Sequence, residues 1–181
     1  MNQNIKNTGI FFGCVLALYY ILVDVVAFFY DPTLFTKTSF GIFNMVVVVI
    51  MGVLCVWIAK KRMQNLITFK EGFSAFLLMI CIGFLANQTM IYVLFNFVRP
   101  EYKEINNQLM LDLLYNNLTA LGMLKEEIEG QMQLAKETDN FALKSLLFSF
   151  AGSILRGSIA GLLIALIFKN KNEFETPKTV Q

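Results

Sequence analysis

The 181-residue chain contains no histidine, only three prolines and only three cysteines. Without histidine it lacks the side chain most often used as a general base near neutral pH and as a metal ligand. Cys14, Cys55 and Cys81 are far apart in the sequence and form no CxxC pair, so we interpret them as small apolar packing residues. We therefore expect no catalytic residues, no metal ion and no other cofactor.

Charge is also scarce and nearly balanced. The chain has 15 basic and 13 acidic residues, which gives a formal net charge of +2. A nucleic-acid-binding domain carries a basic face or stripe, so we expect no nucleic-acid partner. Hydrophobic residues make up 56% of the chain and the mean hydropathy is +0.59. This composition is typical of a membrane protein and not of a soluble domain.

Four long apolar runs predict membrane-spanning helices. They cover about residues 8–30, 40–59, 73–98 and 146–168. Each reaches the roughly 20 residues that an α-helix needs to cross a bilayer, where only helices satisfy their own backbone groups within one segment. We predict an all-α integral membrane protein in which four transmembrane helices form a bundle within a single domain, 1–181. The first run is too long for a removable signal and lacks a small-residue cleavage site.

The basic residues predict the orientation of the chain. Most lie in three segments that an even number of spans places on one side of the membrane. These segments contain Lys6, then Lys60, Lys61, Arg62 and Lys70, and finally Lys169, Lys171 and Lys178. Because basic loops stay in the cytoplasm, we expect a multi-pass protein with both termini cytoplasmic.

The segment at about 101–137, between the third and fourth spans, predicts an outer amphipathic helical hairpin. Apolar residues recur there at helical spacing: Ile105, Leu109, Met110, Leu113, Leu114, Leu118 and Leu121. A polar face is expected to hold Asn106, Asn107, Asp112, Asn116 and Asn117. Gly122 is a plausible helix stop, and a second helix fits 124–136. We expect the hairpin to cap the bundle, because an interfacial anchor usually has a lysine-rich polar face. The alternative is that it rests at the lipid interface.

Short segments along nearly the whole chain resemble one bacterial family. Phe69-Lys70-Glu71-Gly72-Phe73 opens the third span and Arg99-Pro100-Glu101-Tyr102 closes it. A leucine-rich and then glutamate-rich hairpin follows, and the Gly- and Ser-rich last span ends in Lys-Asn-Lys. These features resemble the four-span family catalogued as Domain of Unknown Function 4199, which usually has Asn-Pro where this chain has Arg99-Pro100. The resemblance implies a bacterial inner (cytoplasmic) membrane protein with no assigned reaction and supplies no catalytic residues. It also implies that genes of this family can lie beside genes for glycosyltransferases that work on lipid carriers.

Asp24 and Arg156 are the only charged side chains within the four apolar runs. An arginine at the centre of a membrane helix costs about 2.5 to 3.5 kcal/mol on insertion scales, so it normally faces protein or water. Counted at about 1.5 Å per residue from the outer end of each run, Arg156 lies about 15 Å deep, near the level of Asn87 and Gln88. Asp24 lies about 9 Å deep on the same count, and the long arginine side chain can span the difference. We predict an intramembrane polar layer of these four residues. Tyr92, Asn96 or Asn44 is expected above it.

Two interpretations of this layer stay open. In the structural one, Arg156 and Asp24 form an internal ion pair that fixes which helix lies against which. In the functional one, an outward-open cavity presents Arg156 to an anionic headgroup or a phosphate.

A stripe of small residues runs along one face of the last span at four-residue spacing. It consists of Ser149, Ser153, Gly157, Gly161 and Ala165. In lipid, helices associate by close backbone approach at such stripes. We expect the stripe to be covered either by another helix of the same bundle or by a second copy of the chain.

These patterns lead to three hypotheses about function. We favour a non-enzymatic accessory or scaffold protein that binds another membrane component, either lipid, a membrane-protein partner or a second copy. The alternative is a small carrier or lipid-binding protein for an anionic or polyprenyl-linked substrate, with Arg156 as the anion contact. An integral membrane enzyme is the third hypothesis, and no catalytic constellation in the sequence supports it.

Overall fold

The computed structural model describes residues 2–170, and all the regular elements in this part of the chain are helical. The long helices are α1 (Gln3–Tyr30), α2 (Thr38–Arg62), α3 (Phe69–Val93) and α6 (Leu143–Phe168). The shorter ones are the 3₁₀ helix η1 (Pro32–Thr36), the π-helix η2 (Leu94–Val98), α4 (Tyr102–Ala120) and α5 (Lys125–Lys136). Four helices, counting α3 with η2 as one, are long and apolar enough to cross a membrane. They match the four predicted runs.

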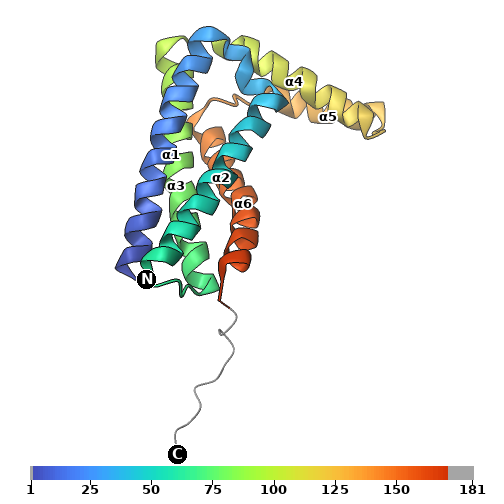
Figure 1. Cartoon of the computed structure of the whole chain (residues 1–181). Coiled ribbons are helices and arrows are strands. Elements are labelled where there is room, and N and C mark those ends of the chain that lie inside the picture. The colour runs from blue at the N-terminus through green and yellow to red at the C-terminus, as the bar shows by residue number, and fades with distance from the viewer. Residues whose placement is uncertain (1, 171–181) are drawn as a thin grey trace, which may run out of the picture.

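The four long helices lie side by side, with α3 in contact with α1, α2 and α6 (Figure 1). Glycine allows the closest approach, between α1 and α3. A Cβ atom added at Gly9 would lie 2.8 Å from the carbonyl oxygen of Ala75, so a larger residue there would force the two backbones apart. Close backbone contact of this kind is how helices associate without a hydrophobic drive.

Phe76 of α3 is the largest side chain at the centre of the packing between α2, α3 and α6. It is fully buried, and a Cβ atom added at Gly52 of α2 or Gly161 of α6 would overlap its ring. The two glycines therefore provide the space that the ring fills. This arrangement explains why two long apolar helices carry a glycine at these positions.

The end of the four helices at which α1 begins and α6 finishes is here called the basic end. The link between α2 and α3 lies there, and it holds the end of α6 in place (Figure 1). Lys60 Nζ donates to the carbonyl oxygen of Phe168 at 3.0 Å, and Asn170 Nδ2 donates to that of Asn65 at 3.0 Å. Lys171 and Lys178, which entered the orientation prediction, lie outside the described residues.

The opposite end carries η1, η2 and the hairpin formed by α4 and α5, and is here called the hairpin end. Gly122, in the left-handed region with φ +72°, separates α4 from α5. The hairpin projects sideways from the four long helices (Figure 1), and besides α5 the contacts of α4 are with η1 and η2. The expectation that it caps the bundle is therefore wrong, because α4 is held only at its root.

The root of the hairpin also differs from the predicted amphipathic pattern. Asn106, expected on the exposed polar face, is fully buried, and its Nδ2 donates to the carbonyl oxygen of Tyr102 at 3.0 Å. Ile105 and Leu113, expected on the covered face, are exposed. Tyr102, one turn before Asn106 on the same side of α4, packs its ring against Phe28.

Candidate functional site

Three of the four predicted polar-layer residues come together between α1 and α3. Asp24 is only 1% exposed, and Asn87 Nδ2 donates to its Oδ2 at 2.8 Å. Gln88 Nε2 donates to Asn87 Oδ1 at 3.4 Å, while the buried Gln88 Oε1 accepts no hydrogen bond from the described residues. A hydrogen bond from an amide to a carboxyl group in an apolar surrounding connects α1 firmly to α3.

The prediction that Arg156 is part of this layer is wrong, and the ion pair with Asp24 that the structural interpretation needs is absent from residues 2–170. Neither of the two ion pairs within residues 2–170 includes Arg156. Its Nη2 donates to Ser153 Oγ at 3.1 Å, and the residue is exposed. Counting residues predicts depth but not direction. Gly157 faces α3, and a step of one residue turns the side chain by about 100° around the helix axis.

The small-residue stripe of α6 is covered at its basic end and open at its hairpin end. A Cβ atom added at Gly157 would lie 3.0 Å from Ile80 Cδ1 of α3. Gly161 and Ala165 are buried, with Gly161 against Phe76. Ser153 is half-buried and Ser149 is exposed. The part of the stripe toward the basic end therefore packs against α3, and the two serines lie at least partly uncovered near Arg156.

The residues expected above the polar layer belong to two other groups. Asn44 of α2 accepts a hydrogen bond from the hydroxyl group of Tyr19 of α1 at 2.8 Å. Asn96 lies in the π-helix η2, where the Arg99 N–H donates to the carbonyl oxygen of Leu94 at 3.1 Å. This widened turn directly precedes Pro100, which has no N–H to continue the helix.

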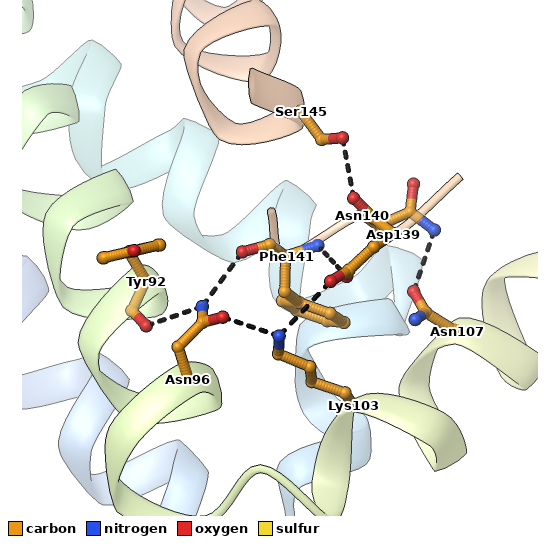
Figure 2. A network of polar contacts seen from close by, with 8 residues as sticks. All are labelled: Tyr92, Asn96, Lys103, Asn107, Asp139, Asn140, Phe141 and Ser145. Carbon is orange, nitrogen blue, oxygen red and sulfur yellow. Dashed lines mark hydrogen bonds and ion pairs between the residues drawn. The ribbon is translucent and has the colours of Figure 1, made fainter. Parts of the chain in front are cut away.

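Asn96 is the centre of a polar network that fixes the root of the hairpin, as Figure 2 shows. Its Nδ2 donates to the carbonyl oxygens of Tyr92 at 2.9 Å and Phe141 at 3.0 Å. Lys103 Nζ donates to Asn96 Oδ1 at 2.6 Å and pairs with Asp139 Oδ2 at 3.3 Å. The end of α3, the start of α4 and the segment before α6 are joined at this point.

Further hydrogen bonds extend the network toward α6 and along α4 (Figure 2). Ser145 Oγ donates to the carbonyl oxygen of Asp139 at 2.7 Å, and Asn140 Nδ2 donates to Asn107 Oδ1 at 3.0 Å. The ring of Phe141 stacks on Phe95, with centroids 4.1 Å apart. Tyr92 and Asn96 were expected above the polar layer, but the sequence gives no signal for Lys103 and Asp139. They look like ordinary solvated hairpin charges, and their separation in the chain has no helical or motif spacing.

The short connection between α1 and α2 carries the second ion pair. Lys37 Nζ lies 2.7 Å from Asp31 Oδ2, and the backbone N–H and the hydroxyl group of Thr33 both donate to Asp31 Oδ1. The hydrogen bond from Lys37, followed by those from Thr33, lowers the pKa of Asp31 to about 2. A cleft of about 500 Å³ separates this region from α4, with Lys37 and Leu113 among its lining residues.

A family model described as a protein of unknown function (DUF4199) matches residues 8–170, which include most of the described helices. No curated protein and no solved structure matches the chain. Within the described part of the chain, no three His, Cys, Asp or Glu side chains gather where they could hold a metal ion.

Proposed function

Because the chain belongs to the DUF4199 family of unknown function, we propose its role from its own geometry: a non-enzymatic accessory or scaffold protein. In this proposal its four long helices form a bundle across the bacterial inner membrane. The basic end faces the cytoplasm with both termini, and the hairpin end faces outward. The protein binds another membrane component, and the hairpin of α4 and α5 is the part that reaches it.

The observation that carries this proposal is the apolar tip of a projecting arm. Leu121 is 77% exposed and Leu124 is 70% exposed, and both lie at the turn between α4 and α5, far from the four long helices (Figure 1). Single exposed leucines are common on protein surfaces. Two of them at the end of an arm whose root is fixed by the Asn96 network form a defined contact point for a partner.

The orientation is supported by the basic end. Lys6 lies in the first turn of α1, and Lys60, Lys61 and Arg62 lie in the last turn of α2. Arg62 Nη1 donates to Thr8 Oγ1 at 3.1 Å. Basic residues concentrated at one end of membrane helices are retained on the cytoplasmic side. The acidic hairpin, with Glu126, Glu127 and Glu129 near the start of α5, is then exported with little hindrance.

The test is affinity purification of the full chain from membranes solubilised in a mild detergent. The double variant Leu121→Gln/Leu124→Gln removes the apolar tip, and Leu134→Gln is the matched control, since Leu134 is 65% exposed but lies away from the turn. We expect the wild-type chain and the control to recover the same partner, or a second copy, and the tip variant to recover at least fivefold less. Recovery of the wild-type chain alone, as a monomer, would exclude the scaffold role.

A second candidate function is favoured by the exposure of Arg156. A small carrier or lipid-binding protein for an anionic or polyprenyl-linked substrate needs a cationic contact within the membrane, and Arg156 has no carboxylate partner within residues 2–170. Uptake of a polyprenyl phosphate into vesicles containing the purified chain tests this role. Equal uptake by the wild-type chain and Arg156→Gln would exclude Arg156 as the substrate contact.

A further inference from the structure

We propose that the half of α6 between its middle and the hairpin end carries a binding site for the phosphate group of an anionic phospholipid, with the Arg156 guanidinium as its main contact. The inference rests on the proposed function in that α6 spans a membrane. It deepens that function by naming one membrane component that the protein binds and the side chains that bind it.

The first argument is the depth of the charge. Arg156 lies near the middle of the 26-residue helix α6, about 20 Å from either end at about 1.5 Å per residue. Its side chain runs toward the hairpin end, as helical side chains do. Nη2 reaches Ser153, and Nη1 lies 3.4 Å from the position that a Cβ atom on Gly152 would occupy. A cation at this depth is not left among acyl chains.

The second argument is the number of unused donors. An arginine side chain offers five N–H donors in a planar fork that matches the oxygens of a phosphate group. Ser153 Oγ accepts one hydrogen bond from Arg156, and within the described residues no carboxylate lies within ion-pair distance. The guanidinium therefore keeps most of its donors available for a ligand outside the chain.

The third argument is a polar track along one side of α6. Ser145, Ser149 and Ser153 succeed one another at intervals of about one turn between the hairpin end and Arg156. Ser149 is exposed, and Gly152 adds no side chain beside the guanidinium. These small polar residues let a headgroup approach from the membrane surface to Arg156. Without them, leucine or phenylalanine side chains would block the route.

The surrounding residues favour a lipid over a helix of another protein as the occupant. Phe148, Leu155 and Ile159 are bulky and strongly exposed on the neighbouring part of α6. Close helix association in membranes uses small residues. On α6 Gly157 and Gly161 face α3, and the large exposed side chains beside Ser149 hold another helix away from it. Acyl chains, unlike a rigid helix, adapt to an uneven surface of large side chains.

The test is lipid retention by the purified full chain. The wild-type chain, Arg156→Gln, Arg156→Lys and the control Lys144→Gln are equilibrated with vesicles of equal parts phosphatidylglycerol and phosphatidylcholine. They are then extracted in mild detergent, and the retained lipids are counted by mass spectrometry. Lys144 is a suitable control because it is an exposed cation in the first turn of the same helix.

We expect the wild-type chain and Lys144→Gln to retain phosphatidylglycerol in preference to phosphatidylcholine. In Arg156→Gln the ratio of retained phosphatidylglycerol to phosphatidylcholine should fall about tenfold, as for the loss of one charged contact. Arg156→Lys keeps the charge without the fork and retains an intermediate preference. Inorganic phosphate alone leaves the thermal unfolding of the wild-type chain unchanged, because the site takes the lipid headgroup.

Three outcomes would overturn the proposal. One is equal phosphatidylglycerol retention by the wild-type chain and Arg156→Gln. Another is an unfolded Arg156→Gln protein, which would show that the guanidinium serves the fold itself. The third is loss of a co-purified protein partner in Arg156→Gln, which would assign the surface to a helix of that partner. Lipid counting on the purified chain and capture of partners from membranes are separate measurements, so either proposal can fail while the other stands.

Discussion

Replacing Gly161 by alanine tests the packing of α6 against α3 with the smallest possible change. The added methyl group would overlap the Phe76 ring, which is fully buried and is also enclosed by Gly52 on the opposite side. The ring cannot move into solvent or lipid, so the two helices must separate. Overpacking of this kind costs about 1 to 3 kcal/mol, and we expect the free energy of unfolding of Gly161→Ala to lie below that of a glycine-to-alanine control without the clash by that amount.

The matched control is Gly41→Ala. Gly41 lies within the helix α2, and a Cβ atom added there meets no other atom within 4 Å. The control thus gives the effect of the same substitution without a steric contact, and the higher helix propensity of alanine, about 1 kcal/mol, applies to both variants. The difference between them isolates the clash with the ring.

A double-mutant cycle with Phe76→Leu identifies the partner. Leucine removes the ring atoms that the new methyl group meets, so the double variant Gly161→Ala/Phe76→Leu should be more stable than the sum of the two single effects predicts. Stability is measured by unfolding in mixed detergent micelles, followed by circular dichroism. If Gly161→Ala is as stable as Gly41→Ala, or if the two changes are additive, the described contact between α3 and α6 is refuted.

Three further predictions concern polar contacts. Asn87→Leu leaves Asp24 without its donor and should lower the free energy of unfolding by about 1 to 3 kcal/mol. Asp24→Asn should lower it less in the same unfolding assay. Equal losses in the two variants would contradict the role of this hydrogen bond. Lys103→Met should increase amide hydrogen exchange in the segment before α6 and leave α1 unchanged, and unchanged exchange in that segment would show that the Asn96 network does not hold the hairpin root. The pKa of Asp31 is lowered from 3.8 to about 2, so its bonds are present above pH 3.8 and are lost as the pH falls through about 2. Lys37→Ala should raise this pKa toward 3.8 in an NMR titration, and an unmoved pKa would assign the shift to Thr33 alone.

The four long helices could be predicted from the sequence because the bilayer imposes one simple rule. About 20 apolar residues in a row must form a helix there, and the ends at Tyr30 and Phe168 follow from where the apolar runs stop. The approximate depth of Asp24 and Asn87 was also predictable, because the rise per residue is constant, although the count placed Asp24 nearer the surface than its hydrogen bond to Asn87 shows. These features depend on distance along an axis.

Directions around and away from the helix axes could not be predicted in the same way. Arg156 lies on the same helix as Gly157, but its side chain points to a different side. No residue count could show that its hydrogen-bond partner is Ser153 and not Asp24. The sideways course of the hairpin depends on Lys103, Asp139 and Asn96, whose contact joins segments far apart in the chain. Such a contact leaves no periodic signal in the sequence.

The attachment of the hairpin root to the end of α3 makes the hairpin a lever with its fulcrum on the central helix. The Phe141 carbonyl and Lys103 both bind Asn96, which continues directly from α3. A torque applied at Leu121 would therefore be delivered to α3, which contacts α1, α2 and α6, and not to α6 alone. A load on the tip would tilt α3 and change its contacts with α1, α2 and α6 together.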